Sequence, residues 1–261
     1  MMRCKSCDEA LVLQIEDEVE DGPAQDTTSE SIPDDLTLTC GCHFHWYAPT
    51  TCLPWHFAIA PSCDTLLPRN EPGPSTANQF LQTSPSAVIL AQYTNEGGTQ
   101  HDLDILPSIT EEAYLQNHPE ARPARAMHIM CSEGDVGGIV ELLHDANDQS
   151  ADVQALILYQ DPLSNMQSGL HLAIEKAQEE VVWLLLWLSS TLSTDTFPIP
   201  ARQVAESLGV GRQSVDADRD IRSLKDSHGR LAENVAQQLP GQWSSLLEAG
   251  VLSPQLSHII R

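Results

Sequence analysis

The residues best suited to chemistry are the cysteines and histidines near the amino terminus. Six of the seven cysteines precede Asp64. Cys4 and Cys7 form a C-x2-C pair, a spacing at which two thiolates can hold one tetrahedral metal ion. Downstream stands Cys40-Gly41-Cys42-His43-Phe44-His45, which adds two thiols and two imidazoles. Cysteines clustered in this way in a reducing compartment are metal ligands more often than disulfide partners, so we expect bound zinc.

The segment 40–45 resembles the centre of a RING-H2 zinc finger, which usually reads Cys-Gly-His-x-Phe-His-x-x-Cys. Cys42 takes the place of the first histidine, and His45 matches the second. Tetrahedral zinc accepts either residue type, so this exchange is harmless. Leu36 and Leu38 resemble the short strand that precedes this centre.

The resemblance implies two ligand groups. One would combine the first cysteine pair with a histidine and a later cysteine, namely Cys4, Cys7, His45 and Cys52. The other would contain the second cysteine pair and the last of the six cysteines, namely Cys40, Cys42 and Cys63. The chain departs from the finger at Ala48, where a cysteine is usual, and no closing Cys-Pro-x-Cys pair follows.

A second hypothesis explains this departure, because the composition of residues 47–82 resembles neither a finger nor a linker. On this hypothesis the stretch is translated intron or a gene-model error, and Cys52 and Cys63 are not ligands. Sequencing the mature transcript tests the idea, which fails if the transcript retains residues 47–82.

The charge of the chain restricts its partners. Thirteen Lys and Arg residues against 37 Asp and Glu residues give a formal net charge of −24 at pH 7. Such a surface repels phosphate groups, so we expect neither a nucleic acid nor a membrane surface as partner. The negative charge favours a basic protein as partner instead. The acidic stretch 16–21 is expected to be a solvated loop, with docking of a basic partner as the alternative.

No secretory signal and no membrane-spanning segment are expected from the sequence. Polar residues follow Met1-Met2-Arg3-Cys4-Lys5, where a secretory signal would be apolar. The longest apolar run, Val181–Leu188, is too short to span a bilayer. We therefore expect an intracellular protein, either cytoplasmic or nuclear.

The chain divides into segments of different composition. We expect a Cys/His-rich RING-like module with an acidic insert (1–48), a disordered Pro/Ser-rich linker (49–86), a strand–turn–helix connector (87–122), helical repeats (123–252) and a tail (253–261). Within the connector, Ala87–Thr94 has the composition of a strand and residues 95–98 that of a turn. Thr110 is expected to cap a helix over residues 111–117.

Residues 123–252 contain three related segments with the apolar spacing of paired helices. The clearest runs from Leu170-His171-Leu172-Ala173 to Leu186 and resembles the ankyrin repeat nearly position for position. His171 falls at the start of the first helix, where the family's histidine bridges neighbouring turns. Ala177 stands where a glycine usually separates the two helices.

The flanking copies diverge from the central one. An earlier copy surrounds His128, and a later copy has Asn234 in place of the histidine. Three copies are about the minimum for a stable stack. Pro198–Leu208 is predicted to form an extra helix between copies. Trp183 and Trp187 either pack against the next helix, which is the preferred interpretation, or form an exposed aromatic anchor.

The predicted fold class is therefore mainly α: an ankyrin-type helical repeat stack with a small Cys/His-rich, zinc-binding module at the amino terminus. No nucleotide-binding or catalytic motif accompanies it; Gly209-Val210-Gly211 lacks the third glycine of a dinucleotide fingerprint. The ankyrin resemblance implies a non-enzymatic scaffold or adaptor that binds another protein. One alternative is a RING-like E3 ubiquitin ligase that recruits a ubiquitin-conjugating enzyme. Another is a chaperone or assembly factor for a basic client.

Overall fold

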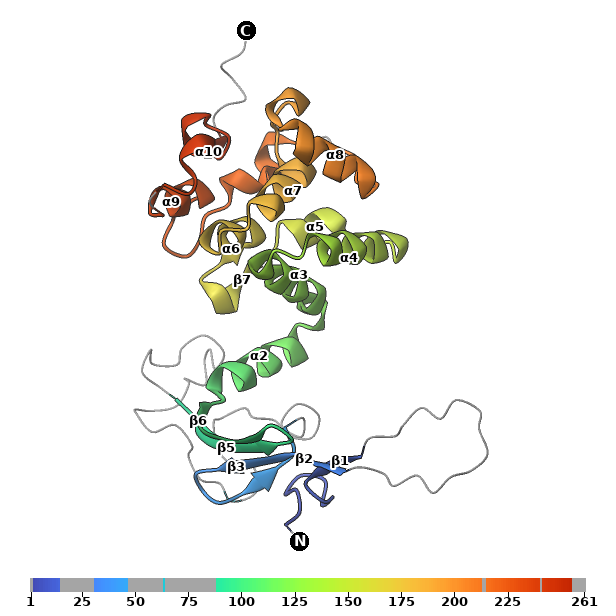
Figure 1. The fold of residues 1–261 in the computed structure, drawn as a ribbon, viewed down its shortest axis with the longest axis vertical. Coiled ribbons are helices and arrows are strands. Elements are labelled where there is room, and N and C mark those ends of the chain that lie inside the picture. The colour runs from blue at the N-terminus through green and yellow to red at the C-terminus, as the bar shows by residue number, and fades with distance from the viewer. Residues whose placement is uncertain are drawn as a thin grey trace, which may run out of the picture. The chain divides into compact units, whose positions relative to one another are not determined.

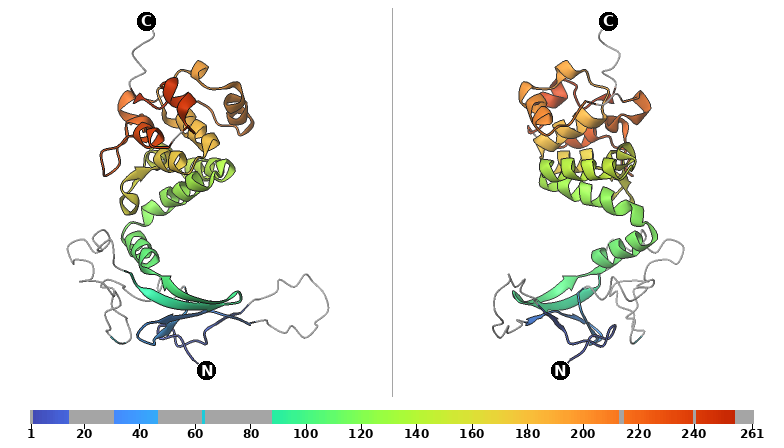
Figure 2. Two further views of the ribbon diagram at one scale, coloured as in Figure 1. Left: turned by 60° about the vertical axis from the view of Figure 1, so that its left-hand side comes forward. Right: turned by 90° about the vertical axis from the view of Figure 1, so that its right-hand side faces the viewer.

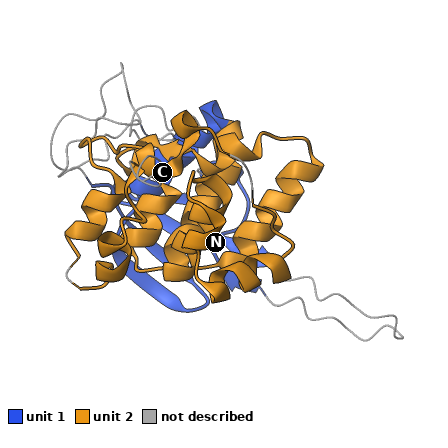
Figure 3. Ribbon diagram, turned by 90° about the horizontal axis from the view of Figure 1, so that it is seen from above, with its two compact units in different colours: residues 1–118 blue, residues 119–261 orange. Residues whose placement is uncertain are grey.

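The structure, a computed structural model, describes residues 2–14, 31–46, 63, 88–212, 215–239 and 241–254. The chain divides into two compact units, residues 1–118 and residues 119–261 (Figure 3). The acidic stretch 16–21, Cys52 and the linker 49–86, apart from Cys63, lie outside the described residues. The expectations made for those segments therefore stay predictions.

The first unit is built on a four-stranded antiparallel sheet with the strand order β4-β3-β5-β6 (Figure 1). Its strands are β3 (Asp35–Leu38), β4 (His43–Phe44), β5 (Leu90–Asn95) and β6 (Gly98–Asp104). A separate antiparallel ribbon joins β1 (Val12–Gln14) to β2 (Ser31–Pro33). Side chains of a strand alternate between the two faces, so Leu36 and Leu38 are buried together in the core of this unit.

The helix α2 (Leu106–Asn117) follows the sheet and covers part of its core with Leu106 and Ile109. It begins earlier than the sequence predicted. Thr110 is not its cap, because it lies inside the helix, where its hydroxyl donates a hydrogen bond of 2.7 Å to the carbonyl oxygen of Leu106. The start is fixed instead by a proline in the first turn, where the missing N–H costs nothing, and by Asp104, whose carboxylate accepts from the backbone N–H of Leu106.

The fold class is thus only partly as predicted. The described chain is about half helical, but the sheet of the first unit is substantial, and the term mainly α understates it. The segment expected to be a connector contributes β5, β6 and α2 to this unit. Its strand β5 lies between β3 and β6. The pairing of β5 with β3 joins residues more than fifty positions apart, which no local pattern predicts, whereas β5 and β6 form a hairpin at residues 95–98.

The second unit is helical (Figures 1 and 2). Its α-helices are α3 (Arg122–Glu133), α4 (Val136–Asp148), α5 (Val153–Ile157), α6 (Gly169–Glu175), α7 (Glu179–Ser189), α8 (Ile199–Ser207), α9 (Ala232–Gln237) and α10 (Ser244–Glu248). A short hairpin pairs β7 (Gln160–Asp161) with β8 (Gln167–Ser168). Single 3-10 turns lie at Pro119–Ala121, Pro162–Ser164, Thr194–Thr196, Ala217–Arg219 and Ile221–Ser223.

The helices of this unit associate in consecutive pairs. α3 packs on α4, α6 packs on α7, and α9 packs on α10. The first helices of the pairs also contact one another in order, α3 with α6 and α6 with α9. One continuous apolar core runs through all three pairs, so no pair has to bury its apolar face alone.

The turn between the helices of a pair needs a left-handed residue. Gly134 supplies it between α3 and α4, with φ of 85°, and Asp135 then caps α4 by accepting from the backbone N–H of Gly138 at 2.8 Å. Between α6 and α7 the corresponding residue is Ala177, with φ of 67°. An alanine in this conformation is strained by its Cβ atom, which a glycine lacks.

His171 connects one helix pair to the next. Its Nδ1 atom is 2.8 Å from the hydroxyl of Ser168 at the start of α6, and its Nε2 atom is 3.1 Å from the carbonyl oxygen of Arg230. His171 is fully buried. Burial lowers its pKa below the usual value, so the ring is neutral at pH 7 and serves to hold the two segments together.

A buried ion pair joins the end of α7 to the carboxyl-terminal part of the unit. Arg222 is fully buried and pairs with Asp220 through two hydrogen bonds, of 3.0 and 2.7 Å. It also donates to the hydroxyl of Thr191 and to the carbonyl oxygens of Val251 and Ser253. Burial alone would raise the pKa of Asp220, but the hydrogen bonds from Arg222 and Thr191 lower it below its usual range.

The extra helix predicted over Pro198–Leu208 is found as α8, and Gly209 follows it with φ of 69°. Trp187 is buried and Trp183 is half-buried. Both pack against Phe197, with ring centroids 5.1 and 5.8 Å away. The packing interpretation therefore holds for Trp187, whereas Trp183 packs against Phe197 on one side and stays partly exposed.

Candidate metal centre

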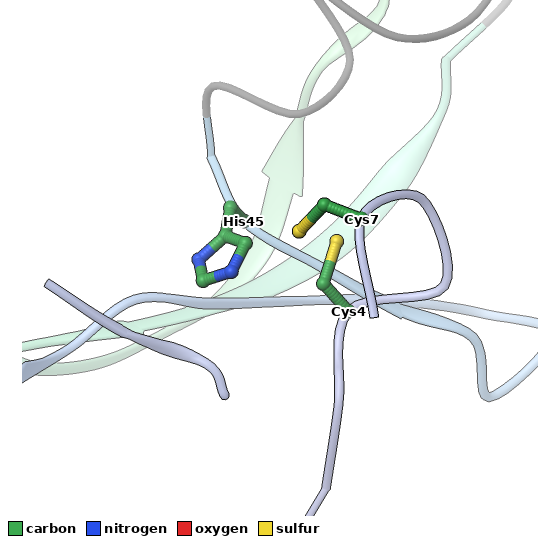
Figure 4. Close-up of side chains that lie close together, drawn as sticks. All are labelled: Cys4, Cys7 and His45. Atoms are coloured by element: carbon green, nitrogen blue, oxygen red, sulfur yellow. The ribbon is translucent and has the colours of Figure 1, made fainter. Parts of the chain in front are cut away.

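The first group of metal-ligand side chains comprises Cys4, Cys7 and His45 (Figure 4). One ligand atom of each residue lies within 4.8 Å of the others. The backbone forms this group through a turn, in which the N–H of Ser6 points to the Cys4 sulfur at 3.4 Å. The N–H of Lys5 donates to the carbonyl oxygen of His43 in β4, which brings the cysteine turn beside the strand that precedes His45.

The imidazole of His45 is oriented as a metal ligand would be. Its Nδ1 atom lies 3.0 Å from a carboxylate oxygen of Asp34. Its Nε2 atom is buried and has no hydrogen-bond partner among the residues that the structure describes. A buried polar atom left in this way costs free energy, whereas a cation among the two sulfurs and this nitrogen would satisfy it.

Asp34 is the support of this arrangement. Its side chain is fully buried, and its second oxygen accepts hydrogen bonds from the N–H of Trp46 at 3.1 Å and the hydroxyl of Tyr93 at 3.0 Å. A carboxylate that fixes the ring of a metal-bound histidine is a recurrent device in zinc sites. Sequence reasoning missed Asp34, because the acid is separated from His45 by eleven positions and lies in an ordinary acidic context.

The second group comprises Cys40, Cys42 and Cys63, whose sulfur atoms lie within 4.8 Å of one another. Cys40 and Cys42 flank Gly41, which has φ of 78° in the tight turn between β3 and β4. Only glycine adopts that conformation freely, so the turn that presents the two thiols depends on it. The Cys42 and Cys63 sulfurs are 3.6 Å apart.

Burial, together with the neighbouring thiols of Cys42 and Cys63, raises the pKa of Cys40 to about 11. Partial desolvation, together with the neighbouring thiol of Cys4, raises the pKa of Cys7, although its side chain is exposed. A thiol binds a metal ion as the thiolate, so loading these groups would release protons.

The two groups alternate along the chain. The first draws on residues 4, 7 and 45, and the second on residues 40, 42 and 63, so each group crosses the other in sequence. These are the two sets that the sequence indicated, except that Cys52 lies outside the described residues. One signal in the sequence went unused: Ala60-Pro61-Ser62-Cys63 resembles the second half of the Cys-Pro-x-Cys pattern, with alanine in place of its first cysteine.

Thiolate and imidazole ligands at these distances suit a soft or borderline divalent cation, and zinc is the usual one in such sites. The remaining described cysteine, Cys131, lies in the core of the second unit, and burial raises its pKa to about 12. It has the environment of a core residue and not of a nucleophile.

The helices of the described residues are too short or too polar to cross a membrane. In the comparisons with known proteins, no family model, no curated protein and no solved structure matches this chain.

Proposed function

We propose that this chain is a non-enzymatic interaction protein, in which an ankyrin-type helical unit binds another protein and zinc stabilises the amino-terminal unit. The observation that carries the proposal is the position of His171. It lies at the start of the first helix of a pair and contacts both Ser168 and the next repeat at Arg230. This is the bridging role that the ankyrin resemblance assigns to it.

The packing of the second unit supports the same proposal. Helix pairs that share one core expose an extended surface, which repeat proteins use to bind partners. The strongly acidic composition favours a partner with a basic surface and an association that weakens as salt is added.

The zinc part of the proposal is supported by the ligand chemistry of the two groups and by the Asp34–His45 contact. The strands on the side of the ligand groups, β1 to β4, have two to four residues each, and a bound metal can supply folding free energy to a small unit of this kind. Zinc would here be structural, because it would connect the cysteine turn at Cys4 to the strand before His45.

The test is cross-linking mass spectrometry on the full chain purified with its partners. Carboxyl-reactive cross-linkers suit a chain with 37 Asp and Glu residues. We expect a partner present in amounts comparable to the chain, with cross-links on exposed residues of the second unit. The proposal is rejected if no such partner is recovered, or if its cross-links fall on the first unit alone.

A second candidate function is a RING-like ubiquitin ligase, and the alternation of the two ligand groups along the chain favours it. Such a ligase would recruit a ubiquitin-conjugating enzyme and hold a substrate on the helical unit. Zinc-loaded protein assayed with a panel of conjugating enzymes tests it. Ubiquitin chains that disappear in Cys40→Ser would support a ligase, whereas no activity with zinc fully loaded would reject it.

A further inference from the structure

An apolar groove lies within the second unit between α7 and α8. These two helices pack together and are labelled in Figure 1. Its volume is about 330 Å³. That value is at the lower end of the roughly 300–1,000 Å³ of ligand sites, so the groove has room for a few side chains.

The wall of the groove is aromatic and held in place. Trp183, Trp187 and Phe197 line it, and Phe197 meets both tryptophans edge to face. Arg212 lies over the rings of Trp187 and Phe197 and donates to carbonyl oxygens at the end of α7, including those of Leu186 and Ser190. These contacts order the wall before any partner arrives, which lowers the entropic cost of binding.

The rim of the groove is acidic. Glu179 and Glu180, in the first turn of α7, are exposed and line it. The Glu179 carboxylate lies 3.4 Å from the indole N–H of Trp183, at the mouth of the aromatic wall. Among the described residues that line the groove there is no lysine, arginine or histidine. The charged side chains that line the groove are therefore both acidic, and the cation of Arg212 lies 5.7 and 5.0 Å from the ring centroids of Trp187 and Phe197.

We propose that this groove binds a short segment of a partner protein, with apolar side chains against Trp183 and Val204 and a lysine or arginine against Glu179 and Glu180. The inference rests on the proposed function and names the chemistry of its partner. Half-buried aromatic side chains in a preformed pocket are typical anchors of protein interfaces. The acidic rim selects a basic segment and disfavours an anionic lipid.

The experiment begins with selection of random 12-residue peptides displayed on phage against the purified full chain. We expect the enriched peptides to combine an apolar anchor with lysine or arginine. Their affinities are then measured by fluorescence anisotropy with labelled synthetic copies. Circular dichroism and thermal melting confirm that each variant below is folded.

Two pairs of variants test the two halves of the recognition. Glu179→Lys with Glu180→Lys should weaken binding about tenfold or more, whereas Glu141→Lys with Glu248→Lys makes the same charge change at exposed sites outside the groove and should change it less than about twofold. Val204→Ser should weaken binding about fivefold. Its control is Ile199→Ser, which removes another exposed apolar side chain of α8, 62% exposed, outside the groove.

The groove proposal is overturned if no peptide is enriched, if the peptides lack basic residues, or if groove and control variants weaken binding equally. The outcomes for the two proposals stay distinct. A partner cross-linked to the second unit without peptide binding would retain the interaction function and reject the groove. If the groove variants weaken peptide binding but no partner is recovered with the chain, the groove is retained as a peptide site and the interaction function is rejected.

Discussion

Among single residues, Asp34 determines how the first ligand group is organised. Its carboxylate faces the Nδ1 atom of His45, which leaves Nε2 for a metal ion, and the same carboxylate is tied to the sheet through Trp46 and Tyr93. The pair Cys4 and Cys7 could be predicted from its spacing, and His45 from the resemblance of residues 40–45 to a RING-H2 finger. Asp34 could not, because its role depends on the contact made only when β3 and β4 pair.

Asp34→Asn should reduce the affinity for zinc by about 10- to 100-fold, because the neutral amide no longer fixes and polarises the His45 ring. The matched control is Asp35→Asn, which changes the next residue, a carboxylate that contacts His43 at 2.8 Å outside both ligand groups. Competition with a chromophoric chelator measures both. Equal losses in the two variants would show that Asp34 does not act through His45.

His128 makes the second unit sensitive to acid. It is buried beside Tyr159, and burial lowers its pKa to about 4, against about 6.5 in an unfolded chain. The folded state thus favours the neutral ring. The contribution of His128 to the free energy of unfolding is fully present above pH 6.5. It is lost as the pH falls toward 4, because the unfolded chain takes up the proton at a higher pH than the folded chain does.

The predicted loss from this one residue is on the order of 2–3 kcal/mol between pH 6.5 and pH 4. His128→Gln should flatten that part of the stability profile in urea titrations at a series of pH values. His144→Gln, at an exposed position of α4, is the control. The interpretation is wrong if His128→Gln follows the same pH profile as the wild-type chain.

Among the helices and strands, regular local patterns were the most predictable. α8 was anticipated almost to the residue, because a proline begins it and Gly209 ends it. α2 was placed too late: Thr110 is a cap residue by type, but Asp104 and the first-turn proline begin the helix at Leu106, five residues before the expected start at residue 111. Cap preference alone does not decide between neighbouring starts.

Ala177→Gly should stabilise the second unit by up to about 1 kcal/mol, because it relieves the left-handed strain at φ of 67° and offsets the greater freedom of glycine in the unfolded chain. Ala146→Gly, inside α4, should instead destabilise it by about 0.5–1 kcal/mol. Chemical denaturation measures both. A loss of stability in Ala177→Gly as large as that in Ala146→Gly would mean that the turn is not strained.

At the scale of the whole molecule, the two units differ in how they are stabilised. The second has a continuous apolar core across three helix pairs. The first has a smaller core, in which the candidate ligand residues Cys4 and Cys42 themselves take part. Its four-stranded sheet could not be predicted, because β3 and β5 are joined by a long stretch without sequence periodicity, and only tertiary packing decides their pairing.

The central claim for the first unit is that its fold surrounds two zinc sites, formed by alternating groups of residues. Native mass spectrometry of the zinc-loaded full chain tests this most directly. We predict two zinc ions per chain, one of which is lost in Cys4→Ser with Cys7→Ser and the other in Cys40→Ser with Cys42→Ser, while Cys131→Ala retains both. A chain that retains no zinc, or a zinc content unchanged by either double substitution, would contradict the account.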